Sequence, residues 1–404
     1  MKVTLSPKKL AGTVAAPPSK SIAHRYLIAA ACADGESRIR GISTSEDISA
    51  TIDCLCALGA EITLSGDVAV VRGIDPRTAA PKAPLPCRES GSTLRFFLPI
   101  CLLSGKEVTL TGSRRLMERP LSVYESLANE RGFALTRRDG GVSVCGPLSG
   151  GEYTVRGDVS SQFITGLLFA LPFAGGGVIR LLPPVESRSY LDLTVAALAR
   201  FGLAITSPDE YTLVVPAADR LTPCDLTVEG DYSNSAFLEA LTLLGHGVHV
   251  TGLTEDSRQG DRVYRDYFQA LLTGTPTLSL ADCPDLGPIL MAVAAALHGA
   301  RFTDTARLAI KESDRGVAMA EELKKFGINV TLAKNEITVP ASYPKTPKEP
   351  LCGHNDHRIV MALATLSTLV GGEIEGAEAV KKSLPEYFSL LTSLGAQVIY
   401  HEAD

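Results

Sequence analysis

The chain has 404 residues, which is too long for one ordinary hydrophobic core and favours two or more domains. Hydrophobic residues make up 45% and charged residues 21%, a composition typical of soluble globular proteins and not of disordered or fibrous ones. The formal net charge of −6 argues against a nucleic-acid partner, which would normally need a basic face.

The apolar segments and the cysteines point to a cytoplasmic protein without a membrane partner. The first ten residues, MKVTLSPKKL, lack the apolar stretch of a signal peptide. The longest apolar run, residues 289–297, is only about half of a membrane span, so we expect a buried helix there. The nine cysteines lack paired zinc or redox spacing, which favours free thiols in a reducing compartment.

In chain order, one sequence pattern recurs: an amphipathic helix, then a glycine, then a short strand rich in β-branched residues. The glycines that end these helices are Gly59, Gly132, Gly202, Gly327 and Gly395, with a blurred copy at Gly274. Each is expected to take the left-handed conformation of a helix C-cap. Most intervals are about 70 residues, and strand-like runs such as 107–112, 211–215 and 336–340 lie between them. The pattern predicts roughly six α/β units in two domains of about three units each.

The strongest local signal is ProProSerLysSerIleAlaHisArgTyrLeu at residues 17–27. Ser19 is a natural N-cap, and the helix that follows places Lys20, Ser21, His24 and Arg25 away from its apolar face. A helix N-terminus with cations attracts anions, because its free amides and dipole add to their charge. From these residues alone, a solvated basic face remains an equal alternative.

Three more small-residue turns precede expected helices in the first half of the chain. Residues 89–97 combine Gly91 with Arg95 one turn later, and residues 111–120 place Arg114, Arg115 and Arg119 in an expected loop. Residues 158–166 offer the hydroxyls of Ser160 and Ser161 and the amide of Gln162 at a helix start. Taken singly, each is more typical of a cap or turn than of a binding site.

The second half supplies complementary charges. Asp285 precedes the apolar helix, and Lys311 and Arg315 are expected four residues apart on one helical face, with Glu312 beside them. Residues 355–363 open a helix with Arg358 in its first turn, and Lys382 lies shortly before a proline.

Competing site classes have little support. The chain has no GxxxxGK[ST] loop, no GxGxxG after a strand and no GxSxG elbow. His354 and His357 have the spacing of a metal pair, but no further ligand cluster accompanies them, and their Asn-Asp context suits capping. We therefore expect no metal and no organic cofactor.

Together, and in this order, the motifs resemble those of the 5-enolpyruvylshikimate-3-phosphate synthase family, which belongs to the enolpyruvyl transferases. The resemblance rests on PPSKSIAHR, GSTLR, LTGSRRLMERP, DVSSQF, KESDR and NDHR, and it spans nearly the whole chain. It implies a two-domain inside-out α/β barrel of six βαβαββ repeats, three per domain. It also implies an N-terminal lobe at residues 18–229 that binds shikimate 3-phosphate, and a lobe of residues 1–17 and 230–404 that binds phosphoenolpyruvate. The active site is expected in the cleft between these domains.

The resemblance also implies roles for individual residues, matched motif by motif. Shikimate 3-phosphate is expected to contact Lys20, Ser21, Arg25, Ser160, Ser161, Ser187, Tyr190 and Lys311. Phosphoenolpyruvate is expected to contact Gly91, Arg115, Arg315, Arg358 and Lys382, with Gln162 between the two substrates. Two departures concern contact details and inhibitor sensitivity: Glu89 and Arg307 stand where family members often have Asn.

The implied reaction moves the enolpyruvyl group of phosphoenolpyruvate to the 5-hydroxyl of shikimate 3-phosphate and releases phosphate, on the route to chorismate and aromatic amino acids. Asp285 is the expected base on that hydroxyl, Glu312 the group that exchanges the methylene proton, and Lys20 the assistant to proton transfer and phosphate departure. Such an enzyme would be a glyphosate target, and we expect it to be a monomer.

Two alternatives remain. A UDP-N-acetylglucosamine enolpyruvyl transferase usually has a reactive Cys in a mobile loop and a Lys-Asn pair near its start; here residues 112–122 contain no Cys, and Ser21 follows Lys20. A non-catalytic anion-binding protein of the same fold is disfavoured by the presence of Lys20, Asp285, Glu312 and Arg358.

Overall fold

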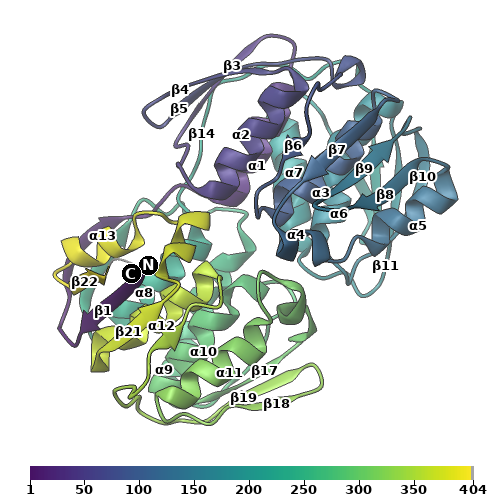
Figure 1. The fold of residues 1–404 in the computed structure, drawn as a ribbon. Coiled ribbons are helices and arrows are strands. Elements are labelled where there is room, and N and C mark those ends of the chain that lie inside the picture. The colour runs from purple at the N-terminus through teal and green to yellow at the C-terminus, as the bar shows by residue number, and fades with distance from the viewer. Residues whose placement is uncertain (402–404) are drawn as a thin grey trace. The chain divides into compact units, whose positions relative to one another are not determined.

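A computed structural model describes residues 1–401 of the chain. The chain forms two compact units (Figure 1). The terminal unit consists of Met1–Ser19 and Gly230–Asp404, and the central unit consists of Lys20–Glu229. Within the described residues, no helix is long and apolar enough to cross a membrane.

The central unit has three four-stranded sheets with one shared topology. In each, the first two strands are parallel and the other two pairings are antiparallel. The first sheet is β14 (Leu226–Thr227), β3 (Glu36–Arg40), β5 (Val68–Arg72) and β4 (Glu61–Ser65). The second is β6 (Leu85–Pro86), β7 (Glu107–Thr111), β9 (Gly141–Cys145) and β8 (Ala134–Arg138). The third is β10 (Gly151–Arg156), β11 (Gly177–Leu182), β13 (Thr212–Val215) and β12 (Thr206–Asp209).

The terminal unit repeats this topology in two of its sheets. One is β20 (Leu351–Cys352), β21 (Gly372–Glu375), β1 (Lys2–Ser6) and β22 (Gln397–His401). Another is β16 (Thr277–Ser279), β17 (Ala300–Thr303), β19 (Glu336–Val339) and β18 (Thr331–Ala333). The last sheet has only the parallel strands β15 (Gly247–Thr251) and β2 (Ala11–Ala15).

The helices of the two units alternate with these strands. Those of the central unit are α1 (Lys20–Ala31), α2 (Glu46–Leu58), α3 (Gly91–Leu102), α4 (Arg114–Glu118), α5 (Ser122–Arg131), α6 (Ser161–Ala170) and α7 (Arg188–Arg200), with 3-10 turns η1 (Pro76–Thr78) and η2 (Leu171–Ala174). Those of the terminal unit are α8 (Tyr232–Leu243), α9 (Tyr264–Thr273), α10 (Gly287–Ala296), α11 (Arg315–Lys325), α12 (His357–Val370) and α13 (Tyr387–Ser393), with 3-10 turns η3 (Gly260–Val263), η4 (Pro284–Leu286), η5 (Ala306–Ile310) and η6 (Ala377–Lys382). The predicted α/β class with six repeats is confirmed, although the repeat of β2 and β15 is short.

The short repeat explains why the helix-glycine-strand pattern at Gly274 differs from the other five. Gly59, Gly132, Gly202, Gly327 and Gly395 have the predicted positive φ, between 77° and 113°. Gly274 has φ 170° instead, so the prediction of a left-handed cap is wrong at this position. Among the described residues, α9 leads directly into β16 with no hairpin between them, so the chain needs no reversal at Gly274.

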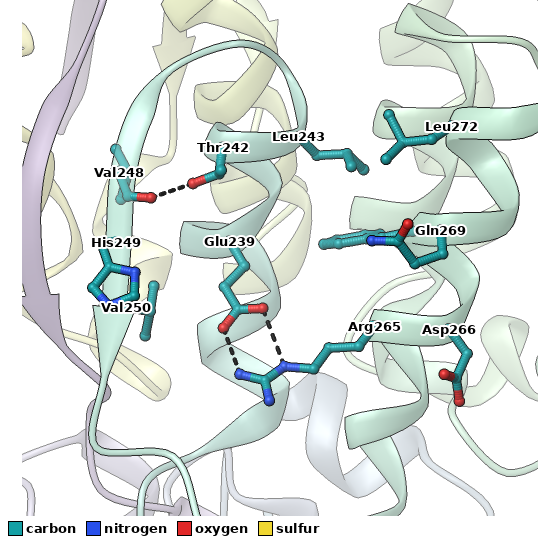
Figure 2. A pocket seen from close by; sticks show the side chains of 11 residues that line it. Glu239, Thr242, Leu243, Val248, His249, Val250, Arg265, Asp266, Gln269 and Leu272 are labelled. Carbon is teal, nitrogen blue, oxygen red and sulfur yellow. Dashed lines mark hydrogen bonds and ion pairs between the residues drawn. The ribbon is translucent and has the colours of Figure 1, made fainter. Parts of the chain in front are cut away.

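A pocket of about 610 Å³ lies beside β15, the strand whose counterparts in the other five sheets pair with a hairpin. It is lined by residues of α8, β15 and α9 (Figure 2). Figure 2 shows Glu239 of α8 bonded to Arg265 of α9, with Nη2–Oε1 at 2.8 Å, and the Thr242 hydroxyl donating to the carbonyl of Val248. The Thr242 hydroxyl thus satisfies a strand carbonyl where a neighbouring strand is missing.

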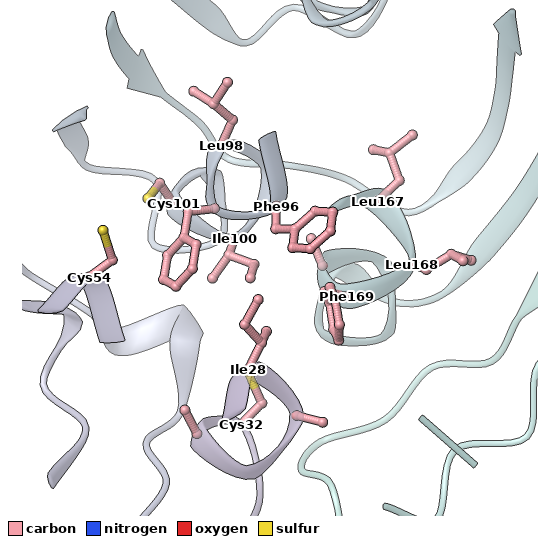
Figure 3. Packing of buried hydrophobic residues seen from close by; sticks show 14 of the residues in the cluster. Ile28, Cys32, Cys54, Phe96, Leu98, Ile100, Cys101, Leu167, Leu168 and Phe169 are labelled. Carbon is pink, nitrogen blue, oxygen red and sulfur yellow. The ribbon is translucent and has the colours of Figure 1, made fainter. Parts of the chain in front are cut away.

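The most deeply buried helices form the inside of each unit, with the sheets around them. In the terminal unit, α8, α10 and α12 pack on one another, and α10 contains the apolar run that we predicted as a buried helix. In the central unit, α3 packs on α6, and the Phe96 and Phe169 ring centroids are 6.0 Å apart (Figure 3). Ile28 of α1 and Cys32, which directly follows that helix, join this cluster, so these helices pack in one close-packed core.

Candidate active site

Most of the predicted site residues lie at or next to the N-terminal end of a helix. Lys20 and Ser21 begin α1, Gly91 begins α3, and Ser160 and Ser161 begin α6. In the terminal unit, Asp285 precedes α10, Arg315 begins α11 and Arg358 lies in the first turn of α12. The first amide groups of each helix lack partners within the helix, so both units present groups suited to anions.

In the central unit, Lys20 is held by a carboxylate of the next helix. Its Nζ lies 2.7 Å from Oδ2 of Asp47, in the first turn of α2. The two side chains are 15% and 11% exposed, so the pair is shielded but still reaches solvent. An incoming anion would therefore compete with Asp47 for the Lys20 ammonium.

Arg25 is buried, and the alternative of a solvated basic face on α1 is wrong at this residue. Its Nε donates to Oγ1 of Thr194 at 2.9 Å, and its Nη2 donates to the carbonyl of Tyr190 at 3.0 Å, both on α7. Burial lowers the pKa of Arg25 to about 10, which still leaves the guanidinium charged at neutral pH. The buried Arg25 guanidinium thus joins α1 to α7 and adds positive charge near the start of α1.

The starts of α3 and α6 are joined through amide and guanidinium groups. Gln162 donates from Nε2 to Oγ of Ser92 at 2.9 Å and accepts at Oε1 from Nη1 of Arg95 at 2.6 Å. Gly91 lies directly against Arg119, because a Cβ added at Gly91 would lie 2.4 Å from Nη1 of Arg119. The absence of a side chain at Gly91 is therefore what admits this guanidinium.

The Arg-rich segment after β7 differs from the prediction of a loop. Ser113 caps the short helix α4, whose first turn includes Arg114 and Arg115. Arg115 is exposed, whereas Arg119 is buried beside Gly91. The structure thus places Arg119, for which the sequence predicted no substrate contact, among the cations near the start of α3.

The serines of the central unit have distinct local roles. Oγ of Ser160 accepts from the amide of Gln162 at 3.3 Å and caps α6, as predicted from the helix start. Ser187 precedes α7 with φ 55° and ψ 41°, a left-handed conformation that is unusual for a residue other than glycine. Tyr190 follows in the first turn of α7, and its carbonyl accepts from Arg25.

A buried polar chain connects the three helices α1, α2 and α3. Nδ1 of His24 lies 2.7 Å from Oγ1 of Thr51, which lies 2.8 Å from Oγ1 of Thr93. Thr93 donates in turn to Oγ of Ser90, the N-cap of α3, at 2.8 Å. Burial, followed by the charges of Lys20 and Arg25, keeps the pKa of His24 well below its usual value, so the imidazole is neutral. Such a network ties the starts of α1 and α3 to fixed positions.

In the terminal unit, three cations converge on Asp285. Its Oδ1 lies 2.7 Å from Nη1 of Arg315 and 3.0 Å from Nζ of Lys311, and its Oδ2 lies 3.1 Å from Nη2 of Arg358. These residues come from three separate segments of the chain. Their convergence surrounds one carboxylate with three positive charges.

The charges of this cluster shift its pKa values in opposite directions. Burial raises the pKa of Asp285, but Arg358, Lys311 and Arg315 outweigh it and hold that pKa well below the usual range. Burial lowers the pKa of Lys311 to about 8, although Asp285 opposes the shift. Burial, together with the charge of Asp285, raises the pKa of Asp261 to about 6. Asp285 is thus ionised at neutral pH, while Lys311 loses its proton only slightly above neutral pH.

Lys311 and Arg315 do not share a helical face, so that prediction is wrong. Helix α11 begins only at Arg315, because Asp314 is its N-cap and accepts from the amide of Val317 at 3.2 Å. Lys311 and Glu312 lie in the segment before it. Glu312 pairs with Arg315 three residues along the chain, and Lys311 and Arg315 both bond to Asp285.

Arg315 holds this part of the site together. It is 1% exposed, and its Nε lies 2.8 Å from Oδ2 of Asp356, while its Nη2 lies 2.8 Å from Oε2 of Glu312. Asp356 also caps α12 by accepting from the amide of Arg358 at 2.9 Å. One guanidinium therefore holds Asp285, Glu312 and the start of the next helix.

Two further cations of the terminal unit, Lys382 and Arg307, interact with residues of the same region. Lys382, at the end of η6, donates from Nζ to the carbonyl of Asn355 at 2.5 Å. Arg307, which stands where family members often have Asn, is buried, and its charge lowers the pKa of Lys311. Glu89, the second position at which family members often have Asn, lies in the central unit and directly precedes the N-cap Ser90 of α3. Arg307 therefore adds to the positive potential near Asp285.

The structure gives no support to a metal pair at His354 and His357. Nε2 of His354 lies 3.0 Å from Oε1 of Glu322, and His357 is buried in the first turn of α12. Within residues 1–401, no group of three or more His, Cys, Asp or Glu side chains could hold a metal ion.

Four residues that contact the predicted set, or interact with it through charge, were not assigned to the site from the sequence. These are Asp47, Arg119, Asp261 and Asp356. Asp356 carried a readable signal, because an Asp before an apolar helix is a typical N-cap. The other three depend on contacts between distant segments, which local patterns do not reveal.

The sequence is similar to those of known proteins over nearly its whole length. The sequence profile of the family described as EPSP synthase (3-phosphoshikimate 1-carboxyvinyltransferase) matches residues 5–271 and 269–391. A 3-phosphoshikimate 1-carboxyvinyltransferase from Clostridium kluyveri is 37% identical over an alignment of 424 positions, which covers 98% of this chain and 98% of that protein. One from Clostridium novyi is 35% identical over an alignment of 423 positions, which covers 97% of each protein.

The fold of a solved relative is also similar. The structure of the EPSP synthase from Acinetobacter baumannii matches with a TM-score of 0.78 and 21% identity, covering 99% of this chain and 100% of that one. At this identity the match supports the two-domain α/β fold alone. The profile match and the full-length relatives establish the family, and this chain is a member of the EPSP synthase family.

Proposed function

We propose that the chain transfers the enolpyruvyl group of phosphoenolpyruvate to the 5-hydroxyl of shikimate 3-phosphate and releases phosphate. Full-length similarity to proteins named 3-phosphoshikimate 1-carboxyvinyltransferase supports this activity. The observation that carries it is the Asp285 cluster, where one ionised carboxylate sits among Lys311, Arg315 and Arg358. That arrangement offers both a base and the cations that anionic substrates need.

The substrates are assigned to the side chains as follows. Shikimate 3-phosphate is bound by Lys20, Ser21, Arg25, Ser160, Ser161, Ser187, Tyr190 and Lys311. Phosphoenolpyruvate is bound by Gly91, Arg115, Arg315, Arg358 and Lys382, and Gln162 contacts both. In this proposal the central unit chiefly binds shikimate 3-phosphate, the terminal unit chiefly binds phosphoenolpyruvate, and turnover needs side chains from both units.

Charge balance supports this assignment. The two substrates carry two phosphates and two carboxylates, about six negative charges near neutral pH. The proposed cations are Lys20, Arg25, Arg115, Lys311, Arg315, Arg358 and Lys382. An acidic chain can therefore still bind anions, because its cations are focused where the substrates bind.

In the proposed mechanism, Asp285 removes the proton of the 5-hydroxyl as its oxygen bonds to the central carbon of phosphoenolpyruvate. The methylene carbon takes a proton from Glu312, giving a methyl group. Elimination returns a methyl proton to Glu312, re-forms the double bond and breaks the bond to phosphate. With the assistance of Lys20, the departing phosphate takes up the proton that Asp285 removed from the hydroxyl. Substrate anions that bind Arg315 and Arg358 would reduce their hold on Asp285 and make that carboxylate more basic.

The direct test is phosphate release from phosphoenolpyruvate with shikimate 3-phosphate as acceptor, run beside UDP-N-acetylglucosamine. We expect release with shikimate 3-phosphate alone. Release with the nucleotide sugar alone would instead indicate the related enolpyruvyl transferase. No release with either acceptor would favour an anion-binding protein without catalytic activity.

A second expectation concerns pH and follows from Lys311. Its pKa of about 8 means that it loses its charge just above neutral pH, whereas phosphate groups with a second pKa of about 6 stay fully ionised there. The affinity for shikimate 3-phosphate should therefore fall by about tenfold between pH 7 and pH 9.5. Calorimetric titration across this range measures it.

The control for the pH dependence is Lys311→Arg, which stays charged and should move the loss of affinity above pH 9.5. The effect on stability has the opposite sign. Between pH 8 and 10.5 the unfolded chain still holds the Lys311 proton that the folded chain has lost, so stability rises with pH in that window. An affinity that stays constant up to pH 9.5 in the unmodified chain would contradict a role for Lys311 in binding.

Location and assembly remain predictions. All nine cysteines are free in the structure, which supports the proposal of a reducing, cytoplasmic compartment. We also propose that the chain acts as a monomer, with its two substrates as partners and neither nucleic acid nor membrane among them.

A further inference from the structure

Glu322 is a buried carboxylate outside the set of residues proposed to touch substrate. It lies on α11 with a side chain only 2% exposed. Its Oε2 accepts from the amide of Cys352 at 2.8 Å, and its Oε1 lies 3.0 Å from Nε2 of His354 and 3.0 Å from Nζ of Lys325. Burial raises the pKa of Glu322, but hydrogen bonds from His354, Lys325 and Cys352 bring it below the usual value. The carboxylate is therefore ionised and anchors the segment before α12.

The segment that Glu322 anchors contains a strained turn. His354 and Asn355 are consecutive and have φ 49° and 50°, in the left-handed region that favours glycine. A residue in this conformation is strained, and it persists only where surrounding contacts determine its backbone. Glu322 supplies these contacts on one side of the turn, through the backbone of Cys352 and the ring of His354.

On the other side of the turn lie the cations of the Asp285 cluster. The carbonyl of Asn355 accepts from Nζ of Lys382 at 2.5 Å. The next residue, Asp356, bonds to Arg315 and caps α12, which carries Arg358 in its first turn. The conformation of the turn therefore sets the positions of Lys382, Arg315 and Arg358.

Helix α11 contacts this segment at two points. Arg315 and Glu322 are two helical turns apart on one face of α11. Arg315 bonds to Asp356 at one end of the segment, and Glu322 bonds to Cys352 and His354 at the other. A rigid helix thus fixes both ends of the turn at a constant separation.

We propose that His354 and Glu322 are positioning residues that hold the 352–356 turn in the conformation needed for Lys382, Arg315 and Arg358 to bind the phosphoenolpyruvate anion. The proposal rests on the proposed function for the identity of the ligand. His354 and Glu322 do not touch substrate; they act through the carbonyl of Asn355 and the side chain of Asp356.

The test compares His354→Ala and Glu322→Gln with the unmodified chain in the phosphate-release assay. Losing a hydrogen bond to a charged partner should raise KM for phosphoenolpyruvate by about tenfold, with kcat and KM for shikimate 3-phosphate changed by less than about threefold. The conservative His354→Gln, which keeps a side-chain N–H donor, should recover most of the affinity. The matched control is Glu321→Gln, whose side chain is 59% exposed and lies 3.9 Å from His354, and it should leave every constant unchanged.

A purely structural role would lower the melting temperature without separating the two KM values, and that result would overturn the proposal. Hydrogen exchange of the amides of residues 352–358 provides a readout that needs no activity, and it should speed up in His354→Ala but not in Glu321→Gln. If the unmodified chain released no phosphate, the proposed function would fail, while unchanged exchange in His354→Ala would by itself refute the positioning role.

Discussion

Replacing Asp285 by Asn is expected to lower kcat for enolpyruvyl transfer by about 10²- to 10⁴-fold, the usual contribution of a general base. The amide has nearly the same shape but cannot take the proton of the 5-hydroxyl. Because the three cations bonded to Asp285 are then released to the substrates, KM for phosphoenolpyruvate should stay the same or fall. Steady-state kinetics in both substrates measure this separation.

The matched control is Asp282→Asn, an exposed carboxylate in the same loop, which should leave kcat unchanged. Binding of shikimate 3-phosphate to the Asp285→Asn variant is expected to persist at neutral pH. A variant that lost this binding while keeping its kcat would show that Asp285 is not the base. The charge of Asp285 also raises the pKa of Lys311, so the variant should lose anion affinity at a lower pH than the unmodified chain.

Replacing Arg315 by Ala is expected to destabilise the terminal unit by about 3–5 kcal/mol, because removing one partner of a buried ion pair leaves the others uncompensated. Arg315 is 1% exposed, and Asp356, one of its partners, is 0% exposed. Asp285 and Glu312 would also lose their bonds to this guanidinium. Urea unfolding followed by circular dichroism measures the loss.

The loss of stability caused by Arg315→Ala should become smaller as the pH falls. In the unmodified chain the pKa of Asp285 is depressed, so the stability that it contributes is lost at acid pH; in the variant the unpaired carboxylates can take up protons instead. The control is Arg301→Ala, which removes an exposed ion pair to Glu336 in the same unit and should leave the urea midpoint almost unchanged. An equally small effect of Arg315→Ala would mean that the buried carboxylates are compensated by other groups.

The local predictions succeeded where neighbouring residues determine the structure. Ser160 caps α6, and the apolar run of α10 is buried, as the sequence indicated. The glycine caps held at five of six positions and failed at Gly274, where α9 leads directly into β16. The residues within a few positions of a helix end determine its cap. They do not determine whether a hairpin follows further along the chain.

The predictions that failed concern burial and the meeting of distant segments. Arg25 lies on the polar side of α1 in the sequence pattern but is buried, because α7 supplies Thr194 and the carbonyl of Tyr190 as acceptors. Lys311 and Arg315 were expected to share a helix, yet they meet at Asp285 while α11 starts only at Arg315. No periodicity within one segment encodes an acceptor that another segment provides.

By itself, the sequence determined the α/β class, the repeated units, the helix starts and, through its motifs, the family and the candidate site residues. Only the tertiary structure decided that Lys311, Arg315 and Arg358 surround one carboxylate, that Arg119 lies against Gly91, and that Glu322 and His354 hold the turn before α12. The physical reason is range. Capping and amphipathicity act within one or two helical turns, whereas pKa shifts and buried ion pairs arise only when packing brings charges from distant segments within a few ångströms of one another.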